Sequence, residues 1–341
     1  GLVPDEPLMR DIAEFGITFL LFLLGLNLQP QELLRMVRKT TVVTRVSSLV
    51  FALAGYLITF AFGFSQLEAL LVGASLIFSS TIIGLKLLPT TVLHHQRMGE
   101  VIISILLLQD LLAIVLMLLV QGAGGGLGRW EMARPLLGLP VLVVLAWLLN
   151  RYVLLRLIRR FDKIQEYIFL MAIGWCLGMA ELAALLGLSS EIGAFIGGVT
   201  LASSPISLFI AESLKPLRDF FLVLFFVSLG IGFDVGTVPQ VALPAGLLAL
   251  VVLVLKPPVF GWLLRRTGES AQRSHEVGFR LGQMSEFSLL IAVLAVERQV
   301  IGEQASYLIQ LATLLTFLVS SYVVVLRFPT PIAVSDRLRR D

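Results

Sequence analysis

One acidic residue, Asp110, stands in the middle of the apolar stretch LLLQDLLAIVL at residues 106–116. A charge at the centre of a bilayer costs at least about 2.5–3.5 kcal/mol, so a charge at this depth usually has a function. A buried carboxylate can release a proton, accept a cation in its place and later reverse the exchange. We therefore take Asp110, together with its neighbour Gln109, as the first candidate for an ion-binding group.

Polar residues interrupt two other apolar runs, and a lysine stands in a third. The interrupted runs are LIFSSTIIGLKLLP at 76–89 and FRLGQMSEFSLLI at 279–291. A helix broken within a membrane leaves backbone groups that need a partner or a cavity, so such breaks line water or ions. The polar residues are Ser79, Ser80 and Thr81 in the first run, Gln283, Ser285 and Glu286 in the second, and Lys256 in the run at 240–264.

Four of these residues fall near the bilayer centre at a helical rise of about 1.5 Å per residue: Ser80, Asp110, Lys256 and Glu286. Their roles stay open at this point. Asp110 either binds an ion or forms a fixed pair with Lys256. Thr81 either coordinates a cation or bonds to its own helix. Glu286 either tunes the site and moves protons or pairs with Arg280.

The composition predicts an all-α polytopic membrane protein. Of the 341 residues, 57% are hydrophobic and 14% charged, whereas a soluble domain carries about 25% charged residues. In such a chain a net charge of +3 does not indicate nucleic-acid binding. The single cysteine, Cys176, forms no intrachain disulfide and argues against a redox role. No convincing enzyme or phosphate-binding motif occurs, so we expect neither an enzyme nor a cofactor.

Apolar runs of about 20 residues predict membrane helices. There are eleven candidates, near 12–29, 41–64, 67–88, 98–121, 136–157, 166–187, 190–210, 216–234, 240–264, 274–297 and 304–327. Alternate connections carry 13 Lys and Arg residues on one side against 4 on the other. The positive-inside rule then predicts a cytoplasmic C-terminus.

A weak internal repeat relates the two interrupted runs. An offset of 205 residues aligns Gly25 with Gly230, Gly73 with Gly278 and Ser80 with Ser285. The offset spans seven expected helices, so the second copy would cross the membrane in the opposite sense. Inverted repeats with paired broken helices are typical of secondary transporters.

Six segments in order carry a family resemblance: FLLFLLGLNLQPQEL, SLIFSSTIIGLKLL, LLLQDLLAIVLMLL, EIGAFIGGVTLASSP, LFFVSLGIGFD and GQMSEFSLLI. Together they resemble the membrane domain of monovalent cation:proton antiporters, closest to the Kef-type potassium-efflux branch of the sodium/hydrogen exchangers. The resemblance implies the sodium/proton-antiporter fold, with two crossing discontinuous helices. That family has thirteen helices, so the expected eleven would be its third to thirteenth, with two preceding helices missing.

The resemblance also implies roles for the candidate residues. Asp110 matches the essential carboxylate that binds a cation or a proton. Gln109 replaces a second acid of electrogenic relatives, which suggests electroneutral exchange. Lys256 would compensate charge or relay protons. Thr81, with Ser79 and Ser80, would supply oxygens to the cation, and Glu286 with Gln283 would act at the second break.

By the same resemblance, residues 41–121 and 240–327 form the ion-translocating core. Residues 1–30 and 166–234 form a dimerisation and gate region, 136–157 a linker helix and 328–341 a cytoplasmic tail. A homodimer in the bacterial inner membrane is expected. Kef-type proteins often continue into a cytoplasmic nucleotide-binding regulatory domain. The resemblance therefore implies such a domain after residue 341 as a partner of this chain.

The expected function is exchange of K+ or Na+ for H+ by competition at Asp110. Two alternatives remain: a sodium-coupled organic solute carrier of similar fold, and a ligand-gated potassium efflux channel or sensor. The solute carrier would need a larger polar cavity than these residues supply. The sequence does not choose between K+ and Na+.

Overall fold

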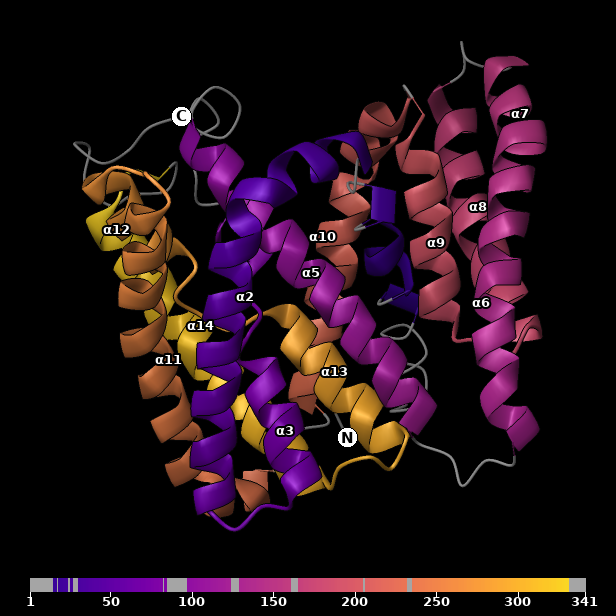
Figure 1. Ribbon diagram of the computed structural model, residues 1–341. Coiled ribbons are helices and arrows are strands. Elements are labelled where there is room, and N and C mark those ends of the chain that lie inside the picture. The colour runs from indigo at the N-terminus through magenta and orange to yellow at the C-terminus, as the bar shows by residue number, and fades with distance from the viewer. Residues whose placement is uncertain are drawn as a thin grey trace. The chain divides into compact units, whose positions relative to one another are not determined.

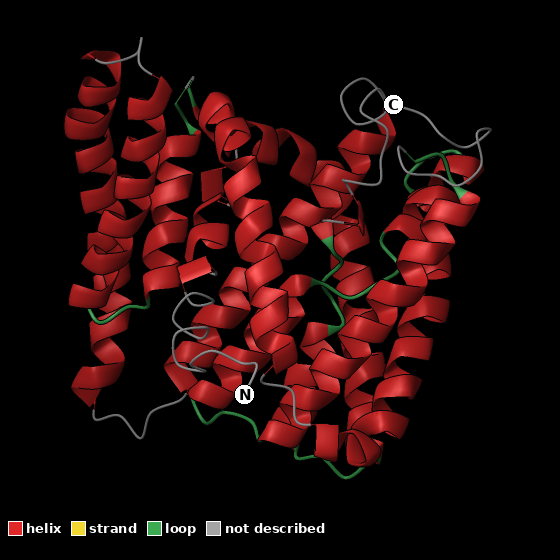
Figure 2. Cartoon of the chain, turned by 180° about the vertical axis from the view of Figure 1, so that it is seen from behind, coloured by secondary structure: helices red, strands yellow, loops and turns green. Residues whose placement is uncertain are grey.

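The computed structural model describes residues 15–16, 18–23, 25–26, 30–81, 83–84, 97–123, 129–160, 165–204, 206–231 and 235–330. Every regular element in these ranges is a helix, as the composition predicts. Figure 2 shows red helices joined by short green connections, with no strand in the part that is coloured.

The chain divides into two compact units. One contains residues 1–33 and 125–233, and the other residues 34–124 and 234–341. Most helices of the second unit are labelled in Figure 1, where α11 and α14 lie side by side. The helices of this unit are α2 (Pro30–Ala61, whose first turn belongs to the other unit), α3 (Gln66–Ser75), α5 (Arg97–Ala123), η3 (Val235–Thr237), α11 (Val238–Arg266), α12 (Ala271–Arg280), α13 (Glu286–Glu297) and α14 (Glu303–Arg327).

Two helical hairpins of the second unit match at the offset found in the sequence. Both α2 and α3 end 205 residues before α11 and α12, respectively. Each hairpin turns at a glycine with positive φ, 86° at Gly63 and 93° at Gly268, a conformation that other residues rarely adopt. A serine then caps the short helix: the Ser65 side chain accepts from the Glu68 amide, and the Ser270 side chain accepts from the Arg273 amide.

Both short helices stop at equivalent positions. After Ser75 the chain leaves the α-helix over residues 76–80, and after Arg280 it leaves the helix over residues 281–285. Helix α13 then begins at Glu286, with Ser285 as its cap, whose side chain accepts from the Phe287 amide at 3.2 Å. The polar residues that interrupt the two apolar runs therefore lie at these two breaks.

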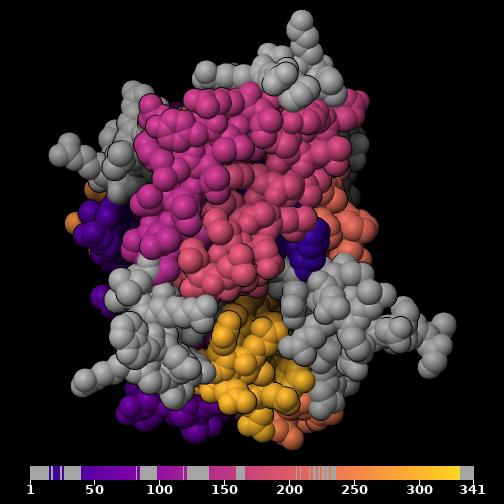
Figure 3. Space-filling model, turned by 90° about the vertical axis from the view of Figure 1, so that its right-hand side faces the viewer, coloured from indigo at the N-terminus to yellow at the C-terminus, as the bar shows by residue number. Residues whose placement is uncertain are grey.

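The first unit packs around apolar helices of its own. They are α6 (Arg129–Leu149), the π-helix η2 (Asn150–Leu154), α7 (Leu155–Arg160), α8 (Gln165–Leu185), α9 (Ser190–Ala202) and α10 (Ser207–Ile231). Phe19, Phe22, Cys176 and Leu201 are part of its core. Small residues bring helices close, because a Cβ on Gly198 would collide with the Phe22 carbonyl. In Figure 3 the magenta-to-pink helices of this unit form a continuous surface.

Six described helices are long and apolar enough to cross a membrane: Thr40–Ala61, Met98–Met117, Gly138–Ile158, Glu166–Leu185, Val238–Arg266 and Glu303–Arg327. The number of eleven stays a prediction. Helices interrupted at a break are too short to qualify, since α3 and α12 have 10 residues each and α13 has 12. The expected spans near 12–29 and 67–88 lie partly outside the described residues.

The apolar span Thr40–Ala61 agrees with the span expected from residue 41. Helix α2 itself begins earlier, at Pro30, because the basic residues before the span continue the helix and proline suits a first helical position. The expected boundary between two later helices is wrong. The expected helix 190–210 ends at Ala202, and α10 begins at Ser207 rather than 216. Pro216 lies inside α10, so the charged and proline-containing segment there is helical and not a connection.

Gly73 and Gly278 allow the two hairpins to close. A Cβ on Gly73 would collide with the carbonyl of Ala52, and one on Gly278 with the carbonyl of Pro257, again at matching positions. We expect Gly73→Ala and Gly278→Ala each to destabilise the protein by about 1–3 kcal/mol through overpacking. The measurement is the apparent melting temperature in detergent. Gly246→Ala in α11, where nothing lies within 4 Å, is the control; equal melting of all three variants would contradict the close packing.

Candidate functional site

A glutamine on helix α5 forms hydrogen bonds with the first break, at residues 76–80. Gln109 is fully buried; its side-chain oxygen accepts from the Ser79 amide at 3.0 Å, and its side-chain nitrogen donates to the Ile77 carbonyl at 2.9 Å. These are backbone groups that the interrupted helix leaves without helical partners. At the second break the Met284 amide donates to Thr316 Oγ1 at 3.1 Å. Ser79 and Met284 are again 205 positions apart.

Lys256 joins the two breaks. Its ammonium donates to the Phe78 carbonyl at 2.7 Å and to the Gln283 carbonyl at 2.8 Å, two residues that also differ by 205 positions. It donates further to Ser79 Oγ at 3.3 Å and lies 5.3 Å from the ring centroid of Phe51. Lys256 is fully buried. The charge is therefore solvated by carbonyl oxygens and an aromatic face rather than by water.

The breaks also contact each other directly. Ser79 Oγ donates to the Leu281 carbonyl at 2.9 Å, and Ser288 Oγ donates to the Ser75 carbonyl at 2.7 Å. Gln283 uses its whole amide: the nitrogen donates to the carbonyls of Arg280 at 2.9 Å and Ser80 at 3.4 Å, and the oxygen accepts from Ser320 at 3.0 Å. Every partner in this network is buried, so the segments are tightly positioned.

A second group of residues carries the negative charge. Thr81 Oγ1 donates to Glu286 Oε1 at 2.6 Å, a distance typical of a charge-assisted hydrogen bond. Asp110 is 2% exposed, and Glu286 is close enough for its negative charge to act on it. Among the described residues, none forms a hydrogen bond or an ion pair with the Asp110 carboxylate. Ser285 Oγ donates to the other oxygen, Glu286 Oε2, at 3.4 Å, so this group contains two buried acids and two hydroxyls.

All eight candidate residues lie in the second unit. The structure joins Ser79, Gln109, Lys256 and Gln283 in one hydrogen-bonded network, and Thr81 with Glu286 in another contact. Asp110 lies next to Gln109 on α5 but makes no hydrogen bond with either group. Ser80 is buried, and its hydroxyl accepts only from the Ile83 amide, at 3.4 Å, among the described contacts.

Two pairings considered from the sequence are absent. Lys256 forms no ion pair with Asp110, because its ammonium is directed at two carbonyls. Glu286 does not pair with Arg280, because the Arg280 guanidinium binds Glu276 at 2.8 Å. No described cationic side chain therefore lies within 4 Å of either acid of the site.

Sequence reasoning missed several residues that complete the site. Phe51 covers Lys256, and the side chains of Thr316 and Ser320 serve the second break. The sequence does contain a pattern that could have indicated Thr316 and Ser320. Thr313, Thr316 and Ser320 are buried polar residues at helical spacing in the apolar helix α14.

A comparison with known protein families matches residues 2–326 to the description "Sodium/hydrogen exchanger, transmembrane". The chain belongs to the sodium/hydrogen exchanger family. This is a family of integral membrane transporters and not of enzymes, which agrees with the six apolar helices. The resemblance stated from the sequence motifs is thereby confirmed.

Similar proteins include three with informative names. The "Iron transporter MagA" of Paramagnetospirillum magneticum is 28% identical over 94% of this chain and 75% of its own length. The "Putative K(+) efflux antiporter KefB" of Alkalimonas amylolytica is 28% identical over 95% of this chain. The "Glutathione-regulated potassium-efflux system protein KefC" of Salmonella typhi is 32% identical over 85% of this chain. The aligned regions cover 50% of KefB and 48% of KefC.

The contacts of Lys256 lead to a stability prediction. Lys256→Met keeps the length of the side chain but removes the donor shared by two buried carbonyls. We expect a loss of about 1–3 kcal/mol for each carbonyl left without a donor, measured as a lower apparent melting temperature in detergent. Arg266→Met is the control, since it removes an exposed cation stacked on Trp262 at 5.2 Å. If both variants melt like the unsubstituted protein, the bridge does not stabilise the breaks.

Proposed function

We propose that this chain exchanges a monovalent cation, K+ or Na+, for H+ across the membrane by competition at Asp110. The observation that carries the proposal is the pair of buried acids, Asp110 and Glu286, without a cationic side chain within 4 Å among the described residues. Two such acids repel each other when both are charged. Binding one proton or one cation relieves that repulsion, so the two ligands compete.

Thr81 places an oxygen atom suited to a monovalent cation against Glu286, the acid whose charge acts on Asp110. We assign Asp110 as the exchanging carboxylate and Thr81 as a neutral oxygen ligand. Thr81 already donates to Glu286, so its oxygen lone pairs remain available to a cation while the acid stays oriented. Ser80 is a further candidate oxygen. Ser79 and Gln283 act instead as positioning residues, because their polar atoms are used in the network between the breaks.

Potassium is the first cation to test. Two of the relatives carry potassium efflux in their names. Iron, which appears in the name of MagA, has less support from the side chains. No three His, Cys, Asp or Glu residues gather into a metal site within the described ranges.

An exchange of one cation for one proton fits the role of Gln109. An amide at this position does not titrate, and both of its polar atoms are bound to the backbone of the break. Lys256, held by two carbonyls, serves as a fixed positive charge rather than a proton carrier. The exchange would then move no net charge.

Inverted repeats with two crossing broken helices are part of the proposal. The offset of 205 positions recurs in the helix ends, the turning glycines and the capping serines, and in the contacts Thr81–Glu286 and Lys256–Phe51. Contacts between the breaks favour a crossing. We propose eleven spans with the cytoplasmic C-terminus that the distribution of basic residues predicts.

We propose further that the two units are the moving parts. The core, 41–121 and 240–327, would carry the ion past a gate formed by 1–30 and 166–234, with 136–157 as the linker and 328–341 as the tail. The division of the chain into 34–124 with 234–341 and the remainder supports this assignment. A homodimer in the bacterial inner membrane, and a regulatory domain after residue 341, complete the proposal; the potassium-efflux relatives extend well beyond the matched region.

Replacing the exchanging carboxylate tests the mechanism. Asp110→Asn keeps the shape but removes the titrating group, so cation-dependent proton movement should fall to the level of empty vesicles. The measurement is a pH-sensitive dye inside proteoliposomes challenged in turn with K+, Na+, Rb+ and Li+. Glu166→Gln, an exposed acid at the start of α8, is the control and should exchange normally.

The same assay separates the alternatives. A solute carrier would move protons or sodium only when an organic substrate is added, and a channel would pass cations without coupled protons. Full activity of Asp110→Asn would refute the site assignment.

The hydroxyl of Thr81 gives a second prediction. Thr81→Val removes the oxygen without changing the size of the side chain. We expect the KM for the cation to rise by about tenfold to a hundredfold, because an interaction with a charged group contributes about 1.5–3 kcal/mol. Thr81→Ser keeps the hydroxyl and should retain a KM near that of the unsubstituted protein. Equal KM values for the two variants would exclude Thr81 as a ligand.

A further inference from the structure

A buried arginine stands at the end of helix α12, outside the ion site. Arg280 is the largest fully buried side chain among the described residues. Its Nε and Nη2 both donate to Glu276 Oε1, at 2.9 and 2.8 Å, and Nη2 also donates to the Pro329 carbonyl at 2.8 Å. A guanidinium buried without partners is very costly, so these contacts fix the arginine and its partners together.

Pro329 belongs to the segment that follows the last helix, and aromatic side chains attach that segment to α12. The ring of Phe328 lies 5.8 Å from that of Phe279 and 6.1 Å from that of His275. The Arg280 guanidinium lies 5.8 Å from the Phe328 ring centroid. We call Glu276, Arg280, Phe328 and Pro329 the clamp.

The clamp lies directly beside the second break. Arg280 is the last residue of α12, and its carbonyl accepts from the side-chain nitrogen of Gln283 at 2.9 Å. The Gln283 carbonyl in turn accepts from Lys256 at 2.8 Å. Glu286 begins α13 immediately after the break. Arg280 therefore lies at the point where α12 ends and the polar segment of the second break, residues 281–285, begins.

We propose that Arg280 is a positioning residue that holds residues 327–330 against α12 and thereby sets the geometry of the break at 281–285. This inference rests on the proposed function where it concerns transport. A displacement of residues 327–330 would act on α12 at Arg280, and the hydrogen bond from Gln283 would carry it to the break. The clamp is thus a route by which the segment 327–330 can change the affinity of the ion site.

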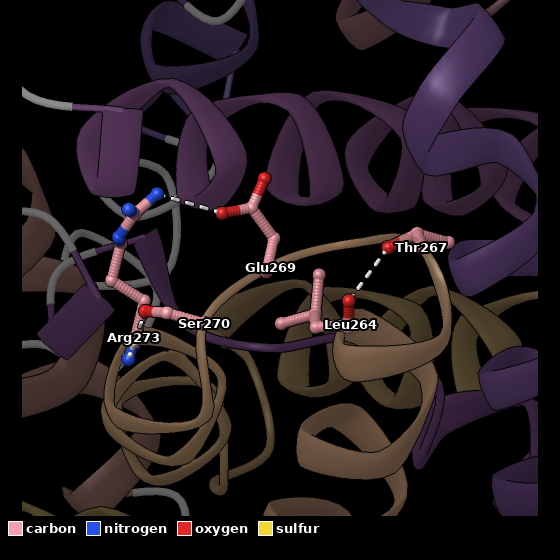
Figure 4. Close-up of polar contacts among 5 residues, drawn as sticks. All are labelled: Leu264, Thr267, Glu269, Ser270 and Arg273. Atoms are coloured by element: carbon pink, nitrogen blue, oxygen red, sulfur yellow. Dashed lines mark hydrogen bonds and ion pairs between the residues drawn. The ribbon is translucent and has the colours of Figure 1, made fainter.

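A matched control stands about two turns closer to the start of the same helix. Arg273 Nη1 pairs with Glu269 Oε2 at 2.9 Å, with the same spacing of four residues, but the Arg273 side chain is 43% exposed. Figure 4 shows this pair beside the cap Ser270 and the turn in which Thr267 donates to the Leu264 carbonyl. Because the Arg273 guanidinium stays in contact with water, this pair contributes less than one whose arginine is fully buried.

The test compares Arg280→Gln, Arg280→Lys and Arg273→Gln by hydrogen–deuterium exchange in detergent. We expect amides of residues 281–285 to exchange about tenfold faster in Arg280→Gln, partial rescue in Arg280→Lys, and no change in Arg273→Gln. In proteoliposomes, Arg280→Gln should raise the KM for the cation with a much smaller effect on kcat. Loss of folding alone would not produce that split.

Phe328→Ala keeps the buried ion pair and provides a second variant if Arg280→Gln does not fold. It should also speed exchange at 281–285, to a smaller extent. Unchanged protection of this segment in folded Phe328→Ala, or in folded Arg280→Gln, would overturn the proposal. Because exchange is read without transport, absence of cation–proton exchange in the unsubstituted protein would count against the proposed function and not against the clamp.

Discussion

The ammonium of Lys256, shared between the carbonyls of Phe78 and Gln283, is the contact on which the described site depends. A broken helix in a low-dielectric medium exposes carbonyls that water cannot reach, and each needs a donor. The Lys256 side chain donates a hydrogen bond to one carbonyl in each break, and these two carbonyls occupy equivalent positions. Because carbonyl groups accept the hydrogen bonds of the Lys256 ammonium, the lysine forms no ion pair with a carboxylate of the site. Lys256 therefore does not pair with Asp110 or Glu286, and the proposed function assigns these acids to the exchanged ions.

The general fold follows from the sequence because its causes are local or periodic. Composition predicts helices in a membrane, and polar residues in apolar runs indicated where the helices break. The boundary at 203–216 was missed, and the extension of α2 back to Pro30 was not foreseen, because Pro216 and the basic residues before 41 were read as connections, whereas both continue helices. The repeat could have been argued more strongly. Gly63 and Gly268, like Ser65 and Ser270, match at the same offset and carry the turn and the cap.

The polar residues that lie at the two breaks could be named from the sequence, but most of their hydrogen-bonding partners could not. A lysine or glutamate within an apolar run stands out in the sequence, because burying its charge is costly whichever group pairs with it. Opposite charges suggested Lys256 with Asp110 and Arg280 with Glu286. In the structure Lys256 instead donates to backbone carbonyls. Every residue has a backbone carbonyl, so the sequence does not indicate which carbonyls accept. Arg280 finds Glu276 one turn away and Pro329 beyond the last helix, a contact that only the tertiary fold creates.

Gln109 illustrates how the breaks and the charge of the site are connected. Its position requires a donor for the Ile77 carbonyl and an acceptor for the Ser79 amide at once. An amide satisfies both in a single protonation state, whereas a carboxylate could donate only when protonated. An acid here would couple its own titration to the geometry of the break. With glutamine, the break keeps one hydrogen-bonding pattern, so under the proposed function binding and release at the neighbouring Asp110 would leave the network around Lys256 unchanged.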